Sequence, residues 1–320
     1  MKVMWLDQEC EWQMTADYVG KVMRRKEVKP YWYQFEFDFT NSLSNKNNFV
    51  RLWDKNAEKD WIRPKSDISI KDNPTKENRF HKLIEALHYA MIEPTTKRAV
   101  VLIGMRADES FNRRKAIMYC HSKKREKPWI SKNDKKIKEA YPIFDWTFED
   151  VWVAIAKYKW DYNKIYDYFY RWGVPKTRMR VSAMIHETAY WQIEYLQEIE
   201  PQTYDRFCKR VHGVNTFAHS FDSDAVQIKE LPYMFKDWKE YRDYLLIHLV
   251  KQEYWELFRN RWEDQSSEDW YKVHCQEIVA NDIDGTKNAN YKSALSIRER
   301  TKQGRPADYD DIIKDLKGRK

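Results

Sequence analysis

The feature that most constrains the fold is a run of five aliphatic residues, Ala99–Ile103, which ends at Gly104 and is followed at once by charged residues. A short run without a polar side chain is typical of a central parallel strand that is buried on both faces. Ligands of open α/β sheets bind beyond the carboxyl ends of such strands. We therefore expect the residues after Gly104 to face a ligand.

The loop after this strand carries the side chains of an anion site. Gly104 lets the backbone turn tightly, and the planar guanidinium of Arg106 matches a phosphate or a sulfate. Glu109 could orient that arginine or accept a hydrogen bond from a ribose hydroxyl. Ser110 is placed to cap the next helix, whose free N–H groups would point at an anion, and Arg113 follows one turn later. The simpler alternative is a surface turn closed by an ion pair.

Acidic side chains also follow two other predicted strands. Asp7 and Glu9 come directly after the apolar run Met1–Leu6, and Asp145 follows Ile143–Phe144. Because the carboxyl ends of parallel strands meet at one edge of a sheet, we expect these acids to share a nucleotide pocket with the arginine loop.

Strand and helix patterns alternate up to Tyr170 and predict an α/β fold with a parallel sheet. The segment Pro30–Asp38 alternates like a strand with one wet face, which would carry Gln34, Glu36 and Asp38. Thr147 and Asp150 form a capping signal for the helix that follows them. Further helices are predicted over Thr15–Arg25, Arg79–Ala90, Glu187–Ile199, Pro201–His212 and Asp237–Trp262.

These patterns divide the chain into three predicted regions. Residues 1–172 form an α/β nucleotide-binding core, residues 173–264 form a helical C-terminal region, and residues 265–320 form a polar, partly mobile tail. The four cysteines are widely scattered without a CxxC pair, which argues against a disulfide framework, a zinc knuckle or an iron–sulfur cluster. No apolar stretch approaches the ~20 residues that cross a bilayer, so we expect no membrane partner and a cytoplasmic protein.

The net charge of +8 and the pI of about 9.0 favour a polyanionic partner, either nucleic acid or a phosphorylated small molecule. Lysines are concentrated in the segments 123–127 and 132–138. A solvated basic surface without a specific partner is the alternative. Aromatic residues make up 16% of the chain, so some of them could stack on bases.

The stretch GMRADESFNRR, followed by YPIFDWTFEDVW and DYNKIYDYF, resembles the phosphoadenosine phosphosulfate (PAPS) reductase family of the PP-loop ATP pyrophosphatase superfamily. The matching residues are Gly104, Arg106, Glu109, Ser110, Arg113, Pro142, Asp145, Trp146, Thr147, Asp150, Trp152, Tyr162, Asn163, Tyr166 and Asp167. Segments such as WLDQECEWQMTADYV and RVHGVNTFAH are similar to a phage and bacterial subgroup with the same domain. Some relatives of that subgroup are described as co-activators that act beside ParB-like partners.

The resemblance implies an adenine nucleotide alpha-hydrolase-like fold that binds ATP or a PAPS-like nucleotide, with Mg²⁺ as a candidate cofactor and a role in sulfur metabolism. The chain departs from the family in three places. The S-G-G-x-D-S phosphate loop is absent, and no two of the seven glycines are adjacent. Gly173–Thr177 replaces a cysteine pair, and the Glu-Cys-Gly-x-His motif has no counterpart. We therefore expect a core that lacks its first β–loop–α unit and does not perform thiol-dependent PAPS reduction.

Two hypotheses on function stay open. The first is a nucleotide-binding protein of the adenylyl- or sulfur-transfer type, in which Asp7, Glu9, Gly104, Arg106, Glu109, Ser110, Arg113 and Asp145 hold the nucleotide. In that case a second polypeptide could supply the missing phosphate loop. The second is a non-catalytic regulatory or DNA-modification factor that binds nucleic acid or a ParB-like protein.

Overall fold

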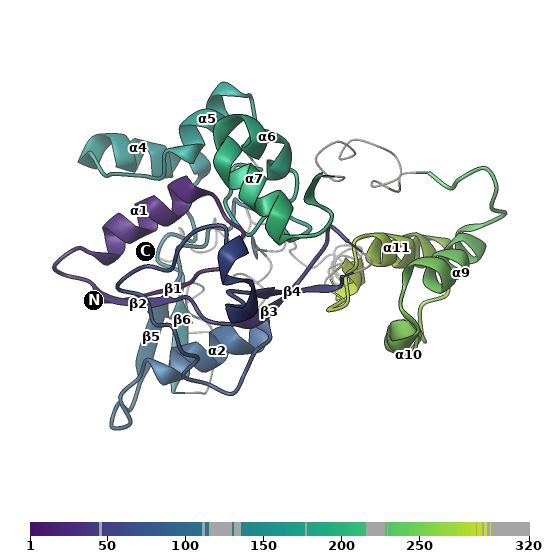
Figure 1. Cartoon of the computed structure of the whole chain (residues 1–320), viewed down its shortest axis with the longest axis horizontal. Helices are drawn as coiled ribbons and strands as arrows, with labels where there is room; N and C mark the ends of the chain where they lie inside the picture. The colour runs from purple at the N-terminus through teal and green to yellow at the C-terminus, as the bar shows by residue number, and fades with distance from the viewer. Residues whose placement is uncertain are drawn as a thin grey trace, which may run out of the picture. The chain divides into compact units, whose positions relative to one another are not determined.

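The computed structural model describes residues 1–44, 47–110, 113–114, 130, 136–176, 178–215, 228, 230–285, 287–289, 291–292 and 295. The chain forms two compact units (Figure 1). Unit 1 comprises Met1–Phe39, Arg51–Ala183 and Leu196–Arg210, and unit 2 comprises Thr40–Val50, Met184–Tyr195 and Val211–Lys320. Cys120, the lysine segment 123–127 and most of the segment 132–138 lie outside the described residues.

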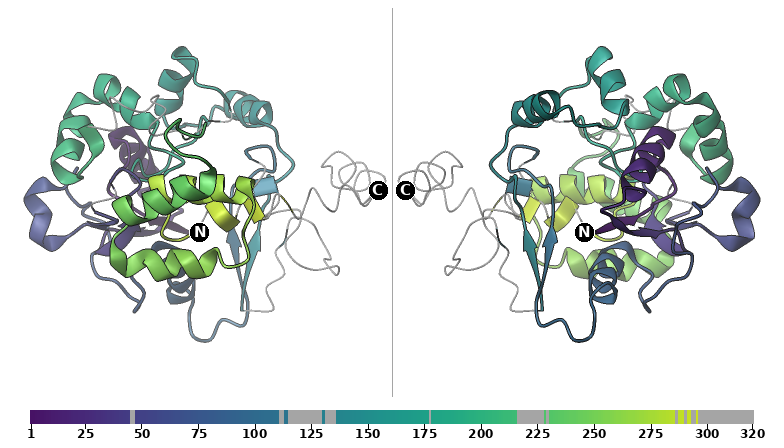
Figure 2. Two further views of the ribbon diagram at one scale, coloured as in Figure 1. Left: turned by 90° about the vertical axis from the view of Figure 1, so that its right-hand side faces the viewer. Right: turned by 90° about the vertical axis from the view of Figure 1, so that its left-hand side faces the viewer.

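Unit 1 contains two pairs of parallel strands, which confirms the prediction of an α/β fold. Strand β1 (Lys2–Leu6) pairs with β2 (Lys29–Tyr33) through helix α1 (Gln13–Met23), with Leu6 opposite Tyr33. Strand β5 (Ala99–Leu102) pairs with β6 (Ile137–Ala140), and both views of Figure 2 show these two strands side by side. Strands β3 (Phe37–Thr40) and β4 (Phe49–Leu52) form a third two-stranded sheet.

Helices α2 (Phe80–Ala90), α4 (Phe148–Tyr158) and α7 (Pro201–Arg210) of unit 1 begin close to the predicted positions. Helices η1 (Lys55–Asp60) and α5 (Ile165–Arg171) were not predicted, and α6 (Gln192–Ile199), which includes residues of both units, begins five residues later than predicted. The predicted capping signal of α4 is confirmed. The hydroxyl of Thr147 accepts a hydrogen bond from the Asp150 N–H at 3.1 Å, and the Thr147 N–H donates to the Asp150 carboxylate at 2.8 Å.

Three details of the predicted strands are wrong, and the first is Ile143–Phe144, which forms a turn and not a strand. Strand β5 is not buried on both faces, because Val100 and Leu102 expose 60% and 63% of their surface and the described part of the chain pairs β5 with β6 alone. The strand predicted over Pro30–Asp38 is interrupted between β2 and β3, and Gln34 is fully buried rather than wet. Its amide donates to the carboxylate of Asp7 at 2.8 Å, which compensates for the loss of water.

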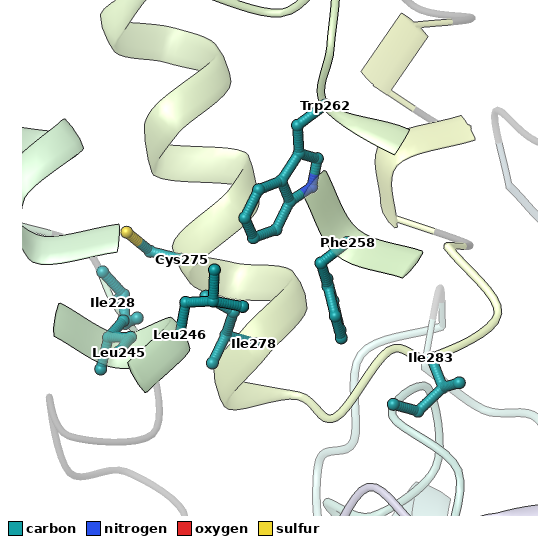
Figure 3. Packing of buried hydrophobic residues seen from close by; sticks show 8 residues of the cluster. All are labelled: Ile228, Leu245, Leu246, Phe258, Trp262, Cys275, Ile278 and Ile283. Carbon is teal, nitrogen blue, oxygen red and sulfur yellow. The ribbon is translucent and has the colours of Figure 1, made fainter. Parts of the chain in front are cut away.

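Unit 2 contains the predicted helix Asp237–Trp262 as three shorter pieces, α9 (Trp238–Leu249), η2 (Gln252–Tyr254) and α10 (Trp255–Arg261). The break follows from Val250, whose ψ of 134° is extended. Helix α11 (Glu268–Val279) was not predicted from the sequence. Figure 3 shows the apolar core that these helices share, formed by Ile228, Leu245, Leu246, Phe258, Trp262, Cys275, Ile278 and Ile283.

A buried histidine lies beside this core. His274 of α11 is fully buried, with its ring stacked 4.4 Å from the ring of Trp262 and 6.0 Å from that of Trp270. Its Nε2 atom is 2.8 Å from the side-chain oxygen of Gln265. Burial lowers the pKa of His274 to about 3, because the charged imidazolium would lose its hydration.

A buried glutamate lies one turn further along α11. Glu277 accepts hydrogen bonds from the indole N–H of Trp262 at 2.7 Å and from Arg261 at 3.1 Å. Burial nevertheless raises the pKa of Glu277 to about 7. The core of unit 2 therefore contains an acid and a base whose neutral forms are both favoured by folding.

This pair predicts opposing effects of pH on stability. Folding favours neutral His274, so its contribution to the free energy of unfolding rises with pH between about 3 and 6.5, whereas the contribution of Glu277 falls between 4.5 and about 7. Glu277→Gln removes the falling contribution. Between pH 4.5 and 6.5, urea denaturation of this variant should show an unfolding free energy that rises more steeply than in the wild type, by up to about 1.4 kcal/mol per pH unit. Equal slopes for the two proteins would contradict the assignment.

Candidate functional site

One cavity of unit 1 collects side chains from three parts of the chain. It measures about 530 Å³ and is lined by the loop after β5, by α4 with Tyr162 and Tyr166, and by residues near 180. This volume lies in the range of small-molecule sites. Of the residues predicted for the nucleotide site, Gly104, Arg106, Glu109 and Arg113 line the cavity. Asp7, Glu9, Ser110 and Asp145 do not line it.

A carboxylate holds two of the cavity's arginines. The Oε1 atom of Glu109 lies 3.4 Å from Nε of Arg106, and its Oε2 atom contacts Nη1 of Arg113. Nη1 of Arg106 is 3.5 Å from the carboxylate of Asp108, but it is buried and has no hydrogen-bond partner. A buried donor without an acceptor is costly, so this atom is a ready partner for an oxyanion.

The cavity concentrates positive charge. Arg180 lines it together with Arg106 and Arg113. Burial lowers the pKa of Arg113, and the charges of Arg180 and Arg106 lower it further. Four cationic side chains, with Lys176 as the fourth, line the cavity against the three carboxylates of Asp108, Glu109 and Glu149. An anion placed among the arginines would therefore relieve repulsion that the carboxylates offset only in part.

An aromatic wall stands beside the arginines. Trp152 of α4 packs edge to face on Tyr162 at 5.2 Å and on Tyr166 at 5.9 Å, and Phe148 lies 6.1 Å away. Burial raises the pKa of Tyr166, although Arg106 and Arg113 favour its ionised form. The helical spacing of Phe148 and Trp152 in the sequence fits a core-facing stripe, so spacing alone did not mark this wall as part of a site.

Gly104 and Ser110 have separate roles around the cavity. A Cβ atom at Gly104 would meet only the Ile143 side chain, at 3.8 Å, so the glycine leaves open space at the cavity wall. The Ser110 hydroxyl accepts from the Arg113 N–H at 3.3 Å, as a helix N-cap does. Asp145 is exposed.

The predicted acids at the end of β1 belong to a separate buried network. Both carboxylate oxygens of Asp7 are occupied: one accepts from the Glu9 N–H at 2.9 Å and from Arg63, and the other from Trp32 at 3.0 Å and Gln34 at 2.8 Å. Asp7 is fully buried, and the side chain of Arg63 is only 4% exposed. In this arrangement Asp7 is a structural anchor.

Glu9 extends this network. Its carboxylate accepts from Nε of Arg210 at 2.8 Å and from the Trp53 N–H at 2.6 Å. Glu9 has a φ of 55°, a region that residues with a side chain adopt rarely, and these contacts stabilise it there. Burial, with the charge of Asp7 as the second cause, raises the pKa of Glu11 to about 8. The network therefore contains two paired carboxylates and a third that retains its proton at neutral pH.

A metal centre is not formed by the described side chains. Throughout the ranges given above, no three His, Cys, Asp or Glu side chains come together in a way that could hold a metal ion. The carboxylate of Glu109 contacts arginines with both oxygens.

Comparison with known proteins places this geometry in a family. The model of the phosphoadenosine phosphosulfate reductase domain matches residues 1–173, which is more than half of the chain. The chain belongs to this family of the PP-loop superfamily. In this PAPS reductase family member, residues 173–317 match a second model, described as a domain of unknown function (DUF3440).

The family member also has a distant relative among curated proteins. It is 26% identical over 273 residues to the uncharacterized protein YbdN of Escherichia coli (strain K12). The match covers 81% of this chain and 66% of YbdN, so the chain spans slightly less than two thirds of that relative. No solved structure matches it. None of the helices in the described ranges has the length and apolar character needed to span a membrane.

The buried network predicts that loss of the Asp7 charge strongly lowers the free energy of unfolding. Asp7→Asn keeps the side-chain shape but leaves the buried Arg63 without its counter-charge, so it should reduce the free energy of unfolding by about 3–5 kcal/mol. Asp67→Asn is the matched control, because Asp67 pairs with Arg24 and its side chain is 74% exposed. That change should cost less than about 1 kcal/mol. Urea denaturation measures both values, and equal losses would contradict the anchoring role of Asp7.

Proposed function

We propose that the protein binds an adenine nucleotide or sulfonucleotide in the arginine cavity, which we define as the cavity lined by Gly104, Arg106, Glu109, Arg113 and Trp152. The observation that carries the proposal is the buried Nη1 atom of Arg106, which lacks a hydrogen-bond partner among crowded arginines. Membership of the PAPS reductase family supports the same ligand class.

The two halves of the cavity suit the two halves of a nucleotide. The guanidinium groups of Arg106, Arg113 and Arg180 would bind the phosphate or sulfate oxygens by charge-assisted hydrogen bonds. The ring of Trp152 and its aromatic neighbours offer a surface for the base. Glu109 acts as a positioning residue, because it contacts two of these arginines at once.

The chemistry that fits this cavity is adenylyl or sulfur transfer. Fixed arginines stabilise the negative charge that develops on a transferred phosphorus or sulfur group. Thiol-dependent reduction is not part of the proposal, because the sequence has no counterpart of the Glu-Cys-Gly-x-His motif. Within the described ranges, burial also raises the pKa of Cys10, Cys208 and Cys275, which disfavours their thiolates. With the S-G-G-x-D-S loop absent from this sequence, we propose that triphosphate binding needs a further polypeptide segment.

We propose that residues 1–172 bind the nucleotide. We also propose that the protein acts in the cytoplasm. Asp7, Glu9, Ser110 and Asp145 do not line the arginine cavity, and the proposal assigns them no contact with the nucleotide. Asp7 and Glu9 belong instead to the buried network at the end of β1. Ser110 contributes by capping the helix that carries Arg113.

The proposal predicts that Arg106→Ala weakens nucleotide binding about 10- to 100-fold, as expected for the loss of charged hydrogen bonds. Isothermal titration with adenosine 3′,5′-bisphosphate and with ATP measures the effect. Arg178→Ala is the control, because it removes the same charge from an exposed position that does not line the cavity. If neither ligand binds the wild type, or if both variants bind alike, the arginine cavity is not the nucleotide site.

A second candidate function is a non-catalytic factor that binds nucleic acid or a ParB-like partner. The rings of Tyr158 and Trp160 stack 5.1 Å apart and are 56% and 53% exposed, which suits base stacking on a chain with a net charge of +8. Oligonucleotide affinity should then fall about 10³- to 10⁵-fold between roughly 50 and 200 mM salt. An affinity that is independent of salt in a fluorescence anisotropy titration would remove this candidate.

A further inference from the structure

Unit 1 contains a second cavity that the proposed function does not use. It measures about 670 Å³, lies beside η1 and residues 61–72, and shares no lining residue with the arginine cavity. Four cationic side chains, two acidic side chains and one indole line it, which gives the lining a net charge of +2. We call it the Trp61 cavity.

Arg63 gives the Trp61 cavity a rigid, buried donor. Its side chain is 4% exposed and is held by the carboxylate of Asp7 and by the backbone oxygen of Glu9, the latter at 2.7 Å. The Nε atom of Arg63 is buried and has no hydrogen-bond partner. Because the two terminal nitrogens are fixed, the orientation of this guanidinium is set before any ligand arrives.

Three lysines add charge to the same cavity without forming ion pairs. Lys55, Lys65 and Lys71 line it, and none of their ammonium groups pairs with a carboxylate of the described chain. Burial lowers the pKa of Lys65, and the charge of Lys55 lowers it further. These two effects together exceed the opposite effect of the nearby glutamates, which raise this pKa. The empty arrangement is therefore repulsive, and a bound anion would relieve it.

Trp61 gives the cavity an aromatic face. The ammonium of Lys65 lies 4.5 Å from its ring centroid, and Trp53 packs on it edge to face at 5.6 Å. The indole N–H donates to the backbone oxygen of Asp54 at 2.9 Å, which fixes the ring orientation. A fixed half-buried ring beside unpaired cations suits a planar base joined to a phosphate.

We propose that the Trp61 cavity binds a nucleoside phosphate, either free or as one unit of a single-stranded nucleic acid. The phosphate contacts Lys65 with Arg63 behind it, and the base stacks on Trp61. Glu58 and Asp72, at the exposed rim, accept hydrogen bonds from the amino groups of the base. The site is distinct from the arginine cavity and does not depend on it.

The test uses the full chain with Arg106→Ala as background, so that binding in the arginine cavity is weakened and the two sites can be separated. Adenosine monophosphate is titrated by calorimetry, and a fluorescein-labelled ten-residue single-stranded oligodeoxyadenylate is titrated by anisotropy. Lys65→Gln should weaken binding of at least one probe about tenfold. Lys59→Gln is the matched control, because Lys59 is exposed on η1 and does not line the cavity.

Each outcome decides the proposal. Binding of the monophosphate that Lys65→Gln weakens and Lys59→Gln preserves identifies a free nucleotide, and the same pattern with the oligonucleotide alone identifies a strand. Absence of binding by both probes, or equal affinity of the Lys65 and Lys59 variants, overturns the proposal. If circular dichroism shows that Lys65→Gln does not fold, the double variant Lys55→Gln/Lys71→Gln, changed at two exposed positions, replaces it. The double variant should then bind the probe more weakly than Lys59→Gln does, and equal affinity overturns the proposal.

Discussion

The buried ion pair between Asp7 and Arg63 is the interaction on which the arrangement of unit 1 depends. Asp7 ends β1 and also accepts hydrogen bonds from Trp32 of β2 and from Gln34 beyond it, so one carboxylate joins two parallel strands to a distant loop. Such a pair does not stabilise a fold by itself, because both charges lose their hydration. Its effect is specificity: with Asp7 and Glu9 in place, the loop that carries Arg63 can dock in one orientation.

Arginine is used in two different ways in this unit. Arg63 and Arg210 face carboxylates of the buried network and are bound by the chain itself. Arg106 lies near two acids, yet one of its terminal nitrogens has no hydrogen-bond partner. A buried donor without an acceptor destabilises the fold by on the order of 1–3 kcal/mol. Such a donor is more easily tolerated where a bound ligand supplies the missing acceptor. Arg63 differs from Arg106 in degree, because the chain binds both of its terminal nitrogens and only its Nε atom lacks a hydrogen-bond partner.

The parts of the fold with local signals could be predicted from the sequence. The aliphatic run of β5, the capping pair of Thr147 and Asp150 and the arginine loop each depend on neighbouring residues. Contacts between distant segments were not predictable: nothing near Asp7 shows that Arg63 will reach it, or that Gln34 will be buried with it. Trp152 illustrates the same limit, because one helical spacing fits both a core residue and a cavity wall. Arg178 and Arg180, which follow the segment YDYFYRWG, are both candidates for the anion site from the sequence, but only Arg180 lines the cavity.

Glu11 has a consequence that extends beyond its own position. The network around β1 holds the carboxylates of Asp7, Glu9 and Glu11 against two arginines, so its formal charges cancel only while Glu11 remains a neutral acid. With a pKa of about 8, Glu11 ionises within reach of mildly alkaline conditions. The end of β1 then holds one uncompensated negative charge in a nearly anhydrous interior. The end of β1 is thus electrically neutral only while the Glu11 carboxyl group keeps its proton.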